Sequence, residues 1–554
     1  MSASDKKKLR KEQAADILSQ KQRQQQAEDK KLKIYTISFI AAMALIVCIA
    51  LVIVGVRAVN QSGIAEKNTI AVSVGDRELN SVEMNYYLVE SFNKFYNEMY
   101  EQYTSYTDMY LGMMGFDTTK PMNAQMYDAE SNKTWADYFL EGAVEQAKND
   151  FALYDLASKE NFELPEDERT ALENTYKNLE TYAKLYGYSN VNKYLSAMYG
   201  YGASMDTYKE YAERSAIAAA FYNAHQDSLT YDNAALREYE STRYNNYNSY
   251  NYSSCYLVYT EFAEGGKEDE ETGEMIYSDE EKAAARAAME AAVKELATAT
   301  TLDELKEKSK DVKVNENSQV SVNDATNMLH TDIGVALAEW LAADERKVGE
   351  IGAVANNVTT TDAEGKETTE LAGYYVVYFA GKDENKEPLA NVRHLLVKFE
   401  GGTTDEETNE TVYSDEEKNA AKTKAEEYLK TWTEGEKTEE SFIELIKEHS
   451  EDTSAEEGGL FEDIHQDSEY VPEFRNWAID PERKAGDAEV IETEFGYHVM
   501  YYVGADETTY RDFMIENDIR TEDQEEWYNG VLEPVTTELK DTSKLLMDMV
   551  LSAG

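Results

Sequence analysis

Cysteine, histidine and basic side chains are all scarce in this chain of 554 residues. The two cysteines exclude a disulfide scaffold and a cysteine-rich zinc site. The histidines are scattered, with no H-x₃-H pair of the kind that binds zinc from one helix face. Lys and Arg number 54 against 109 Asp and Glu. The resulting net charge of −55 argues against a nucleic-acid-binding protein, which needs a basic face.

Hydrophobic residues make up 42% of the chain, enough to build packed cores and to exclude wholesale disorder. At roughly 100–200 residues per domain, the length predicts three or four domains. Acidic runs at 268–272 and 405–408 lack the EF-hand pattern, so they indicate solvated loops rather than calcium sites.

Charge is distributed unevenly along the chain. Residues 1–33 hold ten Lys or Arg and five Asp or Glu, a net charge of +5, which leaves −60 for the remainder. The next 23 residues, 34–56, carry no charged side chain, and a helix of that length spans a hydrocarbon core of about 30 Å. We therefore predict a basic cytoplasmic tail at 1–33 and a transmembrane helix at 34–56. The positive-inside rule then places the acidic remainder outside the cell.

The apolar run is longer than that of a secretory signal, and no convincing small-residue cleavage site follows it. Cys48 follows Ile46 and Val47 rather than a small residue, which argues against a lipoprotein signal. The pattern favours an uncleaved, single-pass anchor in the cell membrane.

Residues 60–251 have the pattern of a helical domain rich in tyrosine. Residues 69–74 alternate and are β-branched, as a strand requires, and Gly75 and Asp76 supply a turn. Asn80 and Glu83 have the spacing of a capping box at the start of the next helix. Aromatic residues follow at helical spacing, which helix packing explains for most of them. An adaptable peptide-binding surface is the alternative.

Four blocks of sequence recur in the same order, which predicts two copies of one domain, at 252–382 and 388–505. Each copy is expected to be α+β with a small, mostly antiparallel sheet, because strands bracket a run of helices. The matched blocks are 254–258 with 393–397, 271–282 with 407–418, 340–349 with 477–486, and 373–381 with 496–504.

The second copy resembles the parvulin family of peptidyl-prolyl isomerases over nearly its whole length. The wider chain resembles PrsA/SurA-type extracytoplasmic foldases, which join a helical chaperone module to one or two parvulin domains. The predicted transmembrane helix departs from the lipid anchor of many PrsA proteins. The matching blocks are VRHLLV at 392–397, SFIELIKEHS at 441–450, SEDTSAEEGG at 450–459, VPEF at 471–474 and FGYHV at 495–499.

The resemblance implies a catalytic network of four residues in the second copy. His394 and His498 match the two histidines that face each other beneath the family's proline pocket. Thr493 matches a hydroxyl residue joined to that pair, and Asp452 falls where the family has Cys or Asp.

The resemblance also implies a substrate pocket, with two departures from the family pattern. Phe474 matches the aromatic ring of the proline pocket. Tyr470 falls where the family usually has Met or Leu, which narrows or repolarises the pocket. The usual Gly-Gly-Asp-Leu-Gly is replaced by GGLFEDI at 458–464.

Isomerisation of an X-Pro bond needs no covalent step and no cofactor. Partial double-bond character sustains an amide barrier of about 18–20 kcal/mol. A dry aromatic wall that holds the prolyl ring, with polar groups near the twisting carbonyl, weakens that conjugation. The histidines are expected to hold the hydrogen-bond network and its tautomers rather than to act as nucleophiles.

The first copy is predicted to keep the parvulin fold without isomerase activity, as a spacer or a peptide-binding surface. It carries Cys255 and Tyr375 at the two histidine positions, and its loop after 309–311 lacks Gly-Gly. The stretch between Gly349 and Gly373 is 14 residues longer than its counterpart, which predicts an enlarged loop.

The segment 506–554 has a helical pattern, and it is expected to return to the chaperone module, as the C-terminal helix does in related foldases. The leading hypothesis is a membrane-anchored foldase that binds unfolded, proline-containing exported proteins and isomerises their X-Pro bonds. A non-catalytic holdase is the alternative, favoured by Tyr470 and the altered loop. A purely structural membrane adaptor is the third possibility.

Overall fold

The computed structural model describes residues 63–268, 275–315, 319–361, 365–404 and 411–550. The predicted cytoplasmic tail at 1–33 and transmembrane helix at 34–56 lie outside these residues. Within the described ranges, no helix combines the length and the apolar character needed to cross a membrane.

The chain folds as two compact units. The first contains residues up to Thr230 together with those from Arg520 onward, and the second contains Tyr231–Ile519. This division does not test the predicted domain limits at 60, 251, 388 and 505, which stay predictions.

A three-stranded antiparallel sheet, in the order β17-β1-β2, opens the first unit. β1 (Ile70–Val74) and β2 (Arg77–Asn80) form a hairpin around the predicted turn, and β2 is a strand that the sequence did not predict. Asn80 then caps α3 (Ser81–Tyr103): its side chain accepts from the Val82 and Glu83 N–H groups, while the Glu83 side chain accepts from the Asn80 N–H. The predicted strand and capping box are confirmed.

Helices make up the rest of the first unit, and aromatic rings fill its core. Tyr86 and Tyr87 are fully buried, and the Tyr86 ring stacks on Tyr211 with centroids 5.1 Å apart. Helix packing therefore explains many of the tyrosines. The helices are α2 (Ile64–Asn68), α4 (Thr107–Met113), α5 (Trp135–Lys159), α6 (Glu166–Leu185), α7 (Val191–Tyr199) and α8 (Met205–Ser228).

The C-terminal residues of the first unit pack on this helical core. Trp527, near the end of α16 (Tyr510–Leu532), stacks on His225 with ring centroids 3.8 Å apart. β17 (Thr537–Leu539) pairs with β1, and Leu545 and Met549 are buried in the same core as α3 and α5.

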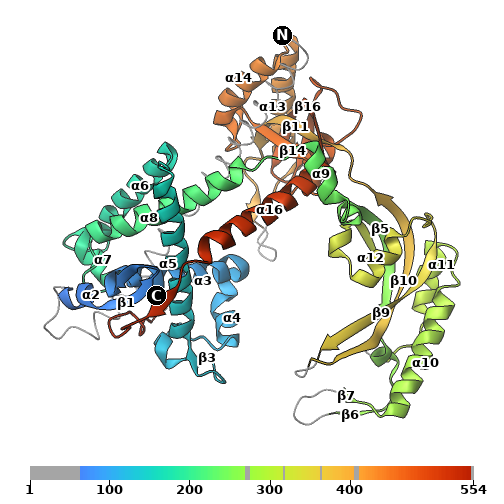
Figure 1. Cartoon of the computed structure of the whole chain (residues 1–554). Helices are drawn as coiled ribbons and strands as arrows, with labels where there is room; N and C mark the ends of the chain where they lie inside the picture. Colours follow the sequence, from blue (N-terminus) through green and yellow to red (C-terminus); the bar gives the residue numbers. More distant parts are fainter. Residues whose placement is uncertain (1–62, 269–274, 316–318, 362–364, 405–410, 551–554) are drawn as a thin grey trace. The chain divides into compact units, whose positions relative to one another are not determined.

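The second unit contains two four-stranded antiparallel sheets of equivalent strand order, β8-β5-β10-β9 and β14-β11-β16-β15 (Figure 1). The α+β prediction is confirmed. The first sheet comprises β5 (Ser249–Leu257), β8 (Asn323–Leu329), β9 (Ile351–Thr361) and β10 (Glu367–Asp383). The second comprises β11 (Pro388–Lys398), β14 (Leu460–Ile464), β15 (Ala488–Thr493) and β16 (Gly496–Thr509).

Each sheet carries two longer helices and one short helix. A serine capping box starts the first helix of each set, at Ser278 and Ser414. In the first set these helices are α10 (Asp279–Leu296), α11 (Leu302–Lys310) and α12 (Val335–Ala342). In the second they are α13 (Asp415–Glu434), α14 (Glu439–His449) and α15 (Pro472–Ala478).

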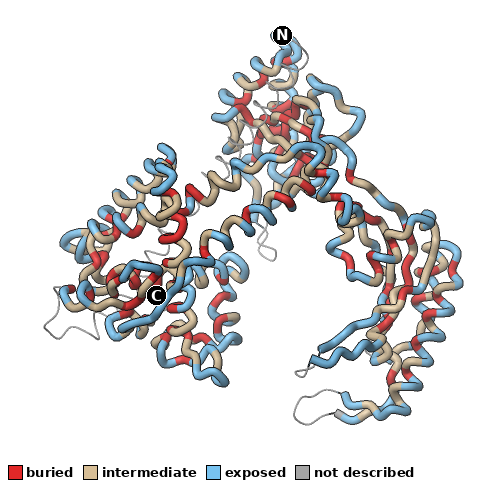
Figure 2. The backbone as a smooth tube through the Cα atoms, viewed as in Figure 1, coloured by how far each residue is buried: buried red, intermediate tan, exposed pale blue. Residues whose placement is uncertain are grey.

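The extra residues of the first copy do not form a larger loop, as the sequence had suggested. They extend β9 and β10 into a long hairpin. Its pairing begins with Ile351 opposite Tyr378 and ends with Thr361 opposite Glu367. Threonines dominate the extension, and the Thr359 and Thr369 hydroxyls lie 2.8 Å apart across it. β-branched side chains favour strands, which explains why the insertion is ordered as a ladder. Figure 2 shows that the hairpin is exposed beyond the sheet.

Arg511 joins the segments that flank the two sheets of the second unit. Its side chain is 1% exposed. It forms an ion pair with Glu240, at the end of α9 (Asn233–Glu240), and donates to Asn248 Oδ1 at 3.0 Å. Its remaining acceptors are the backbone carbonyls of Tyr244, Tyr247 and Glu384.

Replacing Arg511 with Met should lower the free energy of unfolding of the second unit by about 3–5 kcal/mol, because three backbone carbonyls lose their donor and Glu240 keeps only the half-exposed Arg237 as a counter-ion. Urea denaturation measures the change. Arg169→Met is the matched control, because Arg169 is 53% exposed and 3.6 Å from Glu166, and it should change stability by less than about 1 kcal/mol. Equal effects of the two substitutions would contradict the assignment of Arg511 as a buried junction.

Candidate active site

His394 and His498 lie on the two central strands of the second sheet and share one face of it. His498 pairs with Leu396, and His394 pairs with Met500, so the two histidines are diagonal neighbours across β11 and β16. Because side chains alternate along a strand, the intervening Leu395 and Val499 point to the opposite face, where they form a core with α13 and α14. Both imidazoles are buried, at 3% and 5% exposure.

The two imidazoles contact each other directly. Their Nδ1 atoms lie 2.8 Å apart, and the rings stack at 19° with centroids 5.0 Å apart. On the far side of His498, Nε2 lies 2.9 Å from the hydroxyl of Thr493, the last residue of β15. The backbone N–H of Phe495 donates to the same hydroxyl at 3.2 Å.

Asp452 lies at the other end of this chain of contacts. Its Oδ1 is 3.6 Å from His394 Nε2, an ion-pair distance rather than a direct hydrogen bond. The same oxygen accepts from the Ser454 N–H at 2.9 Å and from the Ser454 hydroxyl at 2.6 Å. These donors orient the carboxylate toward the imidazole.

Two backbone attachments hold the loop that carries Asp452 against β11. The Glu451 N–H donates to the Leu396 carbonyl at 2.9 Å. At the far end of the loop, His394 N–H donates to the Gly459 carbonyl at 3.0 Å. Gly459 has a φ of +60°, and a Cβ there would lie 2.4 Å from the His394 carbonyl oxygen. The turn therefore needs glycine at this position.

Burial and neighbouring groups set the charges of this network. Burial alone would raise the pKa of Asp452, but His394 and the Ser454 donors outweigh it and hold that pKa well below its usual range. Burial, aided by the proximity of His394, lowers the pKa of His498 to about 3. At neutral pH, Asp452 is therefore charged and His498 is neutral.

These charges favour one direction of hydrogen bonding. An ionised Asp452 only accepts, so the nitrogen of His394 that faces it, Nε2, carries a proton. The contact between the two Nδ1 atoms needs one donor and one acceptor, and His498 is the donor if its Nε2 accepts from Thr493. His498 Nε2 then accepts from the Thr493 hydroxyl at 2.9 Å. The reverse direction would leave that hydroxyl to donate to the Gly496 carbonyl at 3.5 Å, a weaker contact. The geometry therefore favours a chain in which Thr493 donates to His498 and His498 donates to His394.

Aromatic rings cover the histidine pair. Phe474, on α15, lies edge-on to both imidazoles, with centroids 5.3 Å from His394 and 5.7 Å from His498. Tyr470 packs against Phe474 at 5.4 Å and is half-buried. All six residues predicted from the sequence therefore gather in one place, although their roles stay predictions.

Phe461 is a site residue that the sequence reasoning missed. It lies 4.9 Å from His394, 5.5 Å from Tyr470 and 5.6 Å from Phe474 between ring centroids. The departure from Gly-Gly-Asp-Leu-Gly produces it, because residues 460–464 form β14, which pairs with β11. The sequence did contain a signal for Phe461, because it is an aromatic residue in a short strand-like run that directly follows Gly-Gly.

The prediction that Cys255 occupies the first histidine position is wrong by one residue. In the second sheet Leu396 faces His498, while in the first sheet Tyr256 faces Tyr375. Ser254 therefore stands at the register position of His394, and Cys255 points into the helix-covered core. The blocks 254–258 and 393–397 align without a gap, so nothing in the sequence indicated that their strand registers differ by one residue. Such a shift matters because it exchanges the two faces of a strand.

The first copy therefore has Ser254 and Tyr375 at the two histidine positions, and Tyr256 lies opposite Tyr375 on the same face of the sheet. Tyr256 and Tyr375 stack with ring centroids 4.5 Å apart. Burial raises the pKa of Cys255 to about 11, so this thiol is not a reactive nucleophile.

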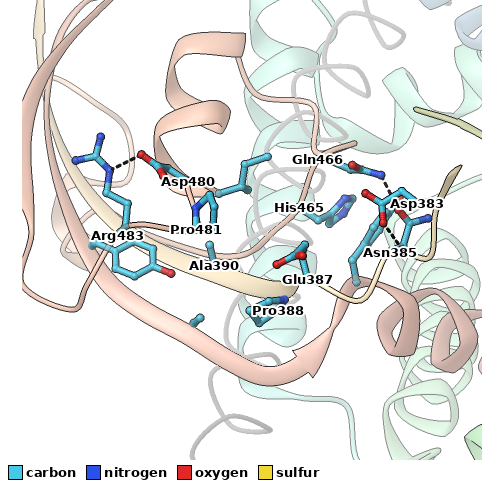
Figure 3. Close-up of a pocket in the computed structure, with 14 residues that line it drawn as sticks. Asp383, Asn385, Glu387, Pro388, Ala390, His465, Gln466, Asp480, Pro481 and Arg483 are labelled. Atoms are coloured by element: carbon cyan, nitrogen blue, oxygen red, sulfur yellow. Dashed lines mark hydrogen bonds and ion pairs between the residues drawn. The ribbon is translucent and has the colours of Figure 1, made fainter. Parts of the chain in front are cut away.

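A separate cavity of about 240 Å³ lies in the second unit, near the segment that joins β10 to β11. Figure 3 shows Asp480 paired with Arg483 on one side and Gln466 bonded to Asn385 on the other. None of the six predicted site residues lines this cavity. Within the described ranges, no cluster of three or more His, Cys, Asp or Glu side chains is arranged to hold a metal ion.

The depressed pKa of His498 predicts acid sensitivity. An unfolded histidine binds a proton below about pH 6.5, whereas folded His498 resists protonation down to about pH 3. Its contribution to stability is therefore complete above pH 6.5 and is lost progressively as the pH falls toward 3. The free energy of unfolding should fall more between pH 7 and pH 5 for the wild type than for His498→Asn. Equal losses would contradict the buried neutral imidazole. Burial also lowers the pKa of His465 to about 4. Because His465 is present in both proteins, its contribution to acid sensitivity is the same in both and does not affect the difference.

Comparison with known families assigns this part of the chain. The family profile of the PPIC-type PPIase domain, or rotamase, matches residues 394–504, about a fifth of the sequence. No curated protein matches the chain.

Three solved structures are similar to part of the chain. PrsA from Bacillus anthracis is 25% identical over 27% of this chain and 59% of its own, with a TM-score of 0.17. PrsA from Bacillus subtilis is 22% identical over 29% and 55%, with a TM-score of 0.19. A SurA-like chaperone structure from Campylobacter jejuni is 20% identical over 27% and 51%, with a TM-score of 0.15.

The matched region spans little more than half of each of these three chains, and such low TM-scores carry no argument about the whole protein. The family match and the site geometry concern the same residues. Residues 394–504 are a PPIC-type PPIase domain.

Proposed function

We propose that residues 388–505 catalyse cis–trans isomerisation of X-Pro bonds. One observation carries this proposal: a chain of contacts from Thr493 through His498 and His394 to Asp452 lies beneath the aromatic rings of Phe474 and its neighbours. The family match over 394–504 supports the same reaction.

The proposed mechanism uses the dryness of this site and imidazoles that carry no charge. Amide resonance places negative charge on the carbonyl oxygen, and water stabilises that charge-separated form. An aromatic wall excludes water and so weakens the double-bond character of the C–N bond. Neutral imidazoles add no positive charge that would restore the planar form. Phe474, Tyr470 and Phe461 would hold the prolyl ring while the preceding carbonyl rotates.

We also propose that the first unit binds unfolded, proline-containing polypeptides. α4 and the turn before it expose large apolar side chains: Tyr106 is 63% exposed, Met109 53% and Met113 76%. Flexible methionine side chains suit surfaces that must accept many partners. Together with the isomerase, this surface would make the protein a foldase.

The proposed location follows from the sequence of the N-terminal residues. The uncharged run at 34–56 would anchor the chain in the cell membrane, with the basic tail cytoplasmic and the acidic body outside. The clients would then be exported proteins. The excess of acidic residues would keep the body soluble.

A holdase without catalytic activity is the second candidate. Tyr470 favours it, because its ring packs on both Phe461 and Phe474 and occupies part of the space that a prolyl ring would need.

A protease-coupled prolyl-peptide assay on the full-length protein tests the isomerase. His498→Ala should lower kcat/KM about tenfold or more, since removing one member of a buried hydrogen-bond network costs about 1.4 kcal/mol or more. Tyr375→Ala, at the equivalent position of the first copy, is the matched control and should keep wild-type activity. Activity that survives His498→Ala would refute the assigned site, and an inactive wild type would favour the holdase.

Suppression of aggregation of a chemically unfolded client tests the binding surface. The triple variant Tyr106→Ser/Met109→Ser/Met113→Ser should require several times more protein for the same suppression, because each substitution removes exposed apolar area. Leu185→Ser is the control, since Leu185 is 70% exposed but lies outside this group. If the triple variant matched the wild type, client binding would not depend on α4.

A further inference from the structure

β17 forms an open edge of the sheet in the first unit. The strand order is β17-β1-β2, so within the described part of the chain β17 has a strand partner on one side only. All three of its residues are exposed, and Leu539 is 52% exposed. Native proteins usually cover, shorten or charge such an edge, because it is a template for another strand.

The backbone hydrogen bonds establish which residues of β17 face outward. Lys540 N–H donates to the Ala71 carbonyl at 2.9 Å, and Gly75 N–H donates to the Thr536 carbonyl at 2.8 Å. In an antiparallel ladder the bonded pairs alternate, so even-numbered residues from 536 to 540 bond to β1. Thr537 and Leu539 therefore direct their N–H and C=O groups away from β1.

These same two residues line a cavity. It has a volume of about 610 Å³ and lies between β17 and one face of α5. Leu140 and Val144 supply apolar lining on α5, one helical turn apart. An extended peptide placed beside β17 would therefore find main-chain partners along one side and apolar side chains along the other.

The charge around the cavity selects its occupant. Asp137, Glu141 and Glu145 line it from α5, and Lys133 is its one basic lining residue. Lys133 is already bound to Glu141, which is 63% exposed. The acidic excess favours a peptide with basic residues and disfavours a second copy of this chain, whose net charge is −55.

We propose that an extended, basic segment of an unfolded polypeptide adds as a strand to β17, with alternate apolar side chains in the cavity against α5. Main-chain pairing recognises no particular sequence, which suits a site for many clients. This inference extends the client-binding part of the proposed function. It does not depend on proline or on the isomerase site.

Fluorescence anisotropy with a proline-free probe tests the proposal. The probe is a fluorescein-labelled decapeptide of alternating lysine and valine, titrated with the full-length protein. Leu539→Pro removes an outward N–H without touching the ladder to β1, and edge strands tolerate proline at such positions. It should weaken binding about tenfold, and Leu539→Ala, which keeps the N–H, should weaken it less. Binding of the Pro variant within twofold of wild type would overturn the proposal.

The acidic residues that line the cavity give a second test, which does not use a proline substitution. Glu141→Lys/Glu145→Lys should weaken binding of the basic probe at least tenfold. Glu426→Lys/Glu427→Lys, an equal change of charge on α13, should leave it nearly unchanged. A probe of alternating glutamate and valine that bound as tightly as the basic probe would contradict the proposal.

Two further readouts separate the possible failures. Sedimentation of the unliganded protein should show no dimer that Leu539→Pro abolishes, since such a dimer would assign the edge to a second copy instead. Prolyl isomerase activity of Leu539→Pro should equal that of wild type. Loss of peptide binding with retained isomerase activity therefore supports the edge site, whereas an inactive wild type that still binds the probe refutes only the isomerase.

Discussion

The contact between two imidazole nitrogens, 2.8 Å apart in a buried site, is the constraint on which the second copy depends. One nitrogen must donate and the other must accept, so the pair cannot carry two charges. Asp452 at one end and Thr493 at the other determine which nitrogen holds each proton. The register of β11 with β16 places the rings, and the close approach at Gly459 keeps the Asp452 loop against them.

This arrangement links fold to chemistry. A sheet face normally filled by aliphatic side chains holds a polar network instead, and its hydrogen bonds lie inside an apolar shell, where an unpaired group is costly. The two imidazoles are therefore held in one arrangement, and the aromatic rings above them exclude water. The first copy has the same strand order but carries Ser254 and Tyr375 at the two histidine positions, so it cannot form an equivalent pair.

The sequence was sufficient to predict the α+β class, the helix caps and the six residues that meet at the site, because family motifs and capping boxes are local patterns. It was insufficient wherever pairing decides the outcome. The strand register moved Cys255 from the site into the core. Pairing also turned a presumed loop into the β9–β10 hairpin and brought Phe461 over His394. The open edge at β17 likewise depends on a pairing between segments more than 460 residues apart, which no local pattern encodes.

The most direct test of this account is the protonation state of the two imidazoles, measured from their ¹⁵N chemical shifts in the full-length protein at pH 7. The account predicts two neutral rings of opposite tautomer, with the proton of His498 on Nδ1 and that of His394 on Nε2. A doubly protonated His394, or a proton of His498 on Nε2, would reverse the hydrogen-bond chain and contradict the proposed neutral site.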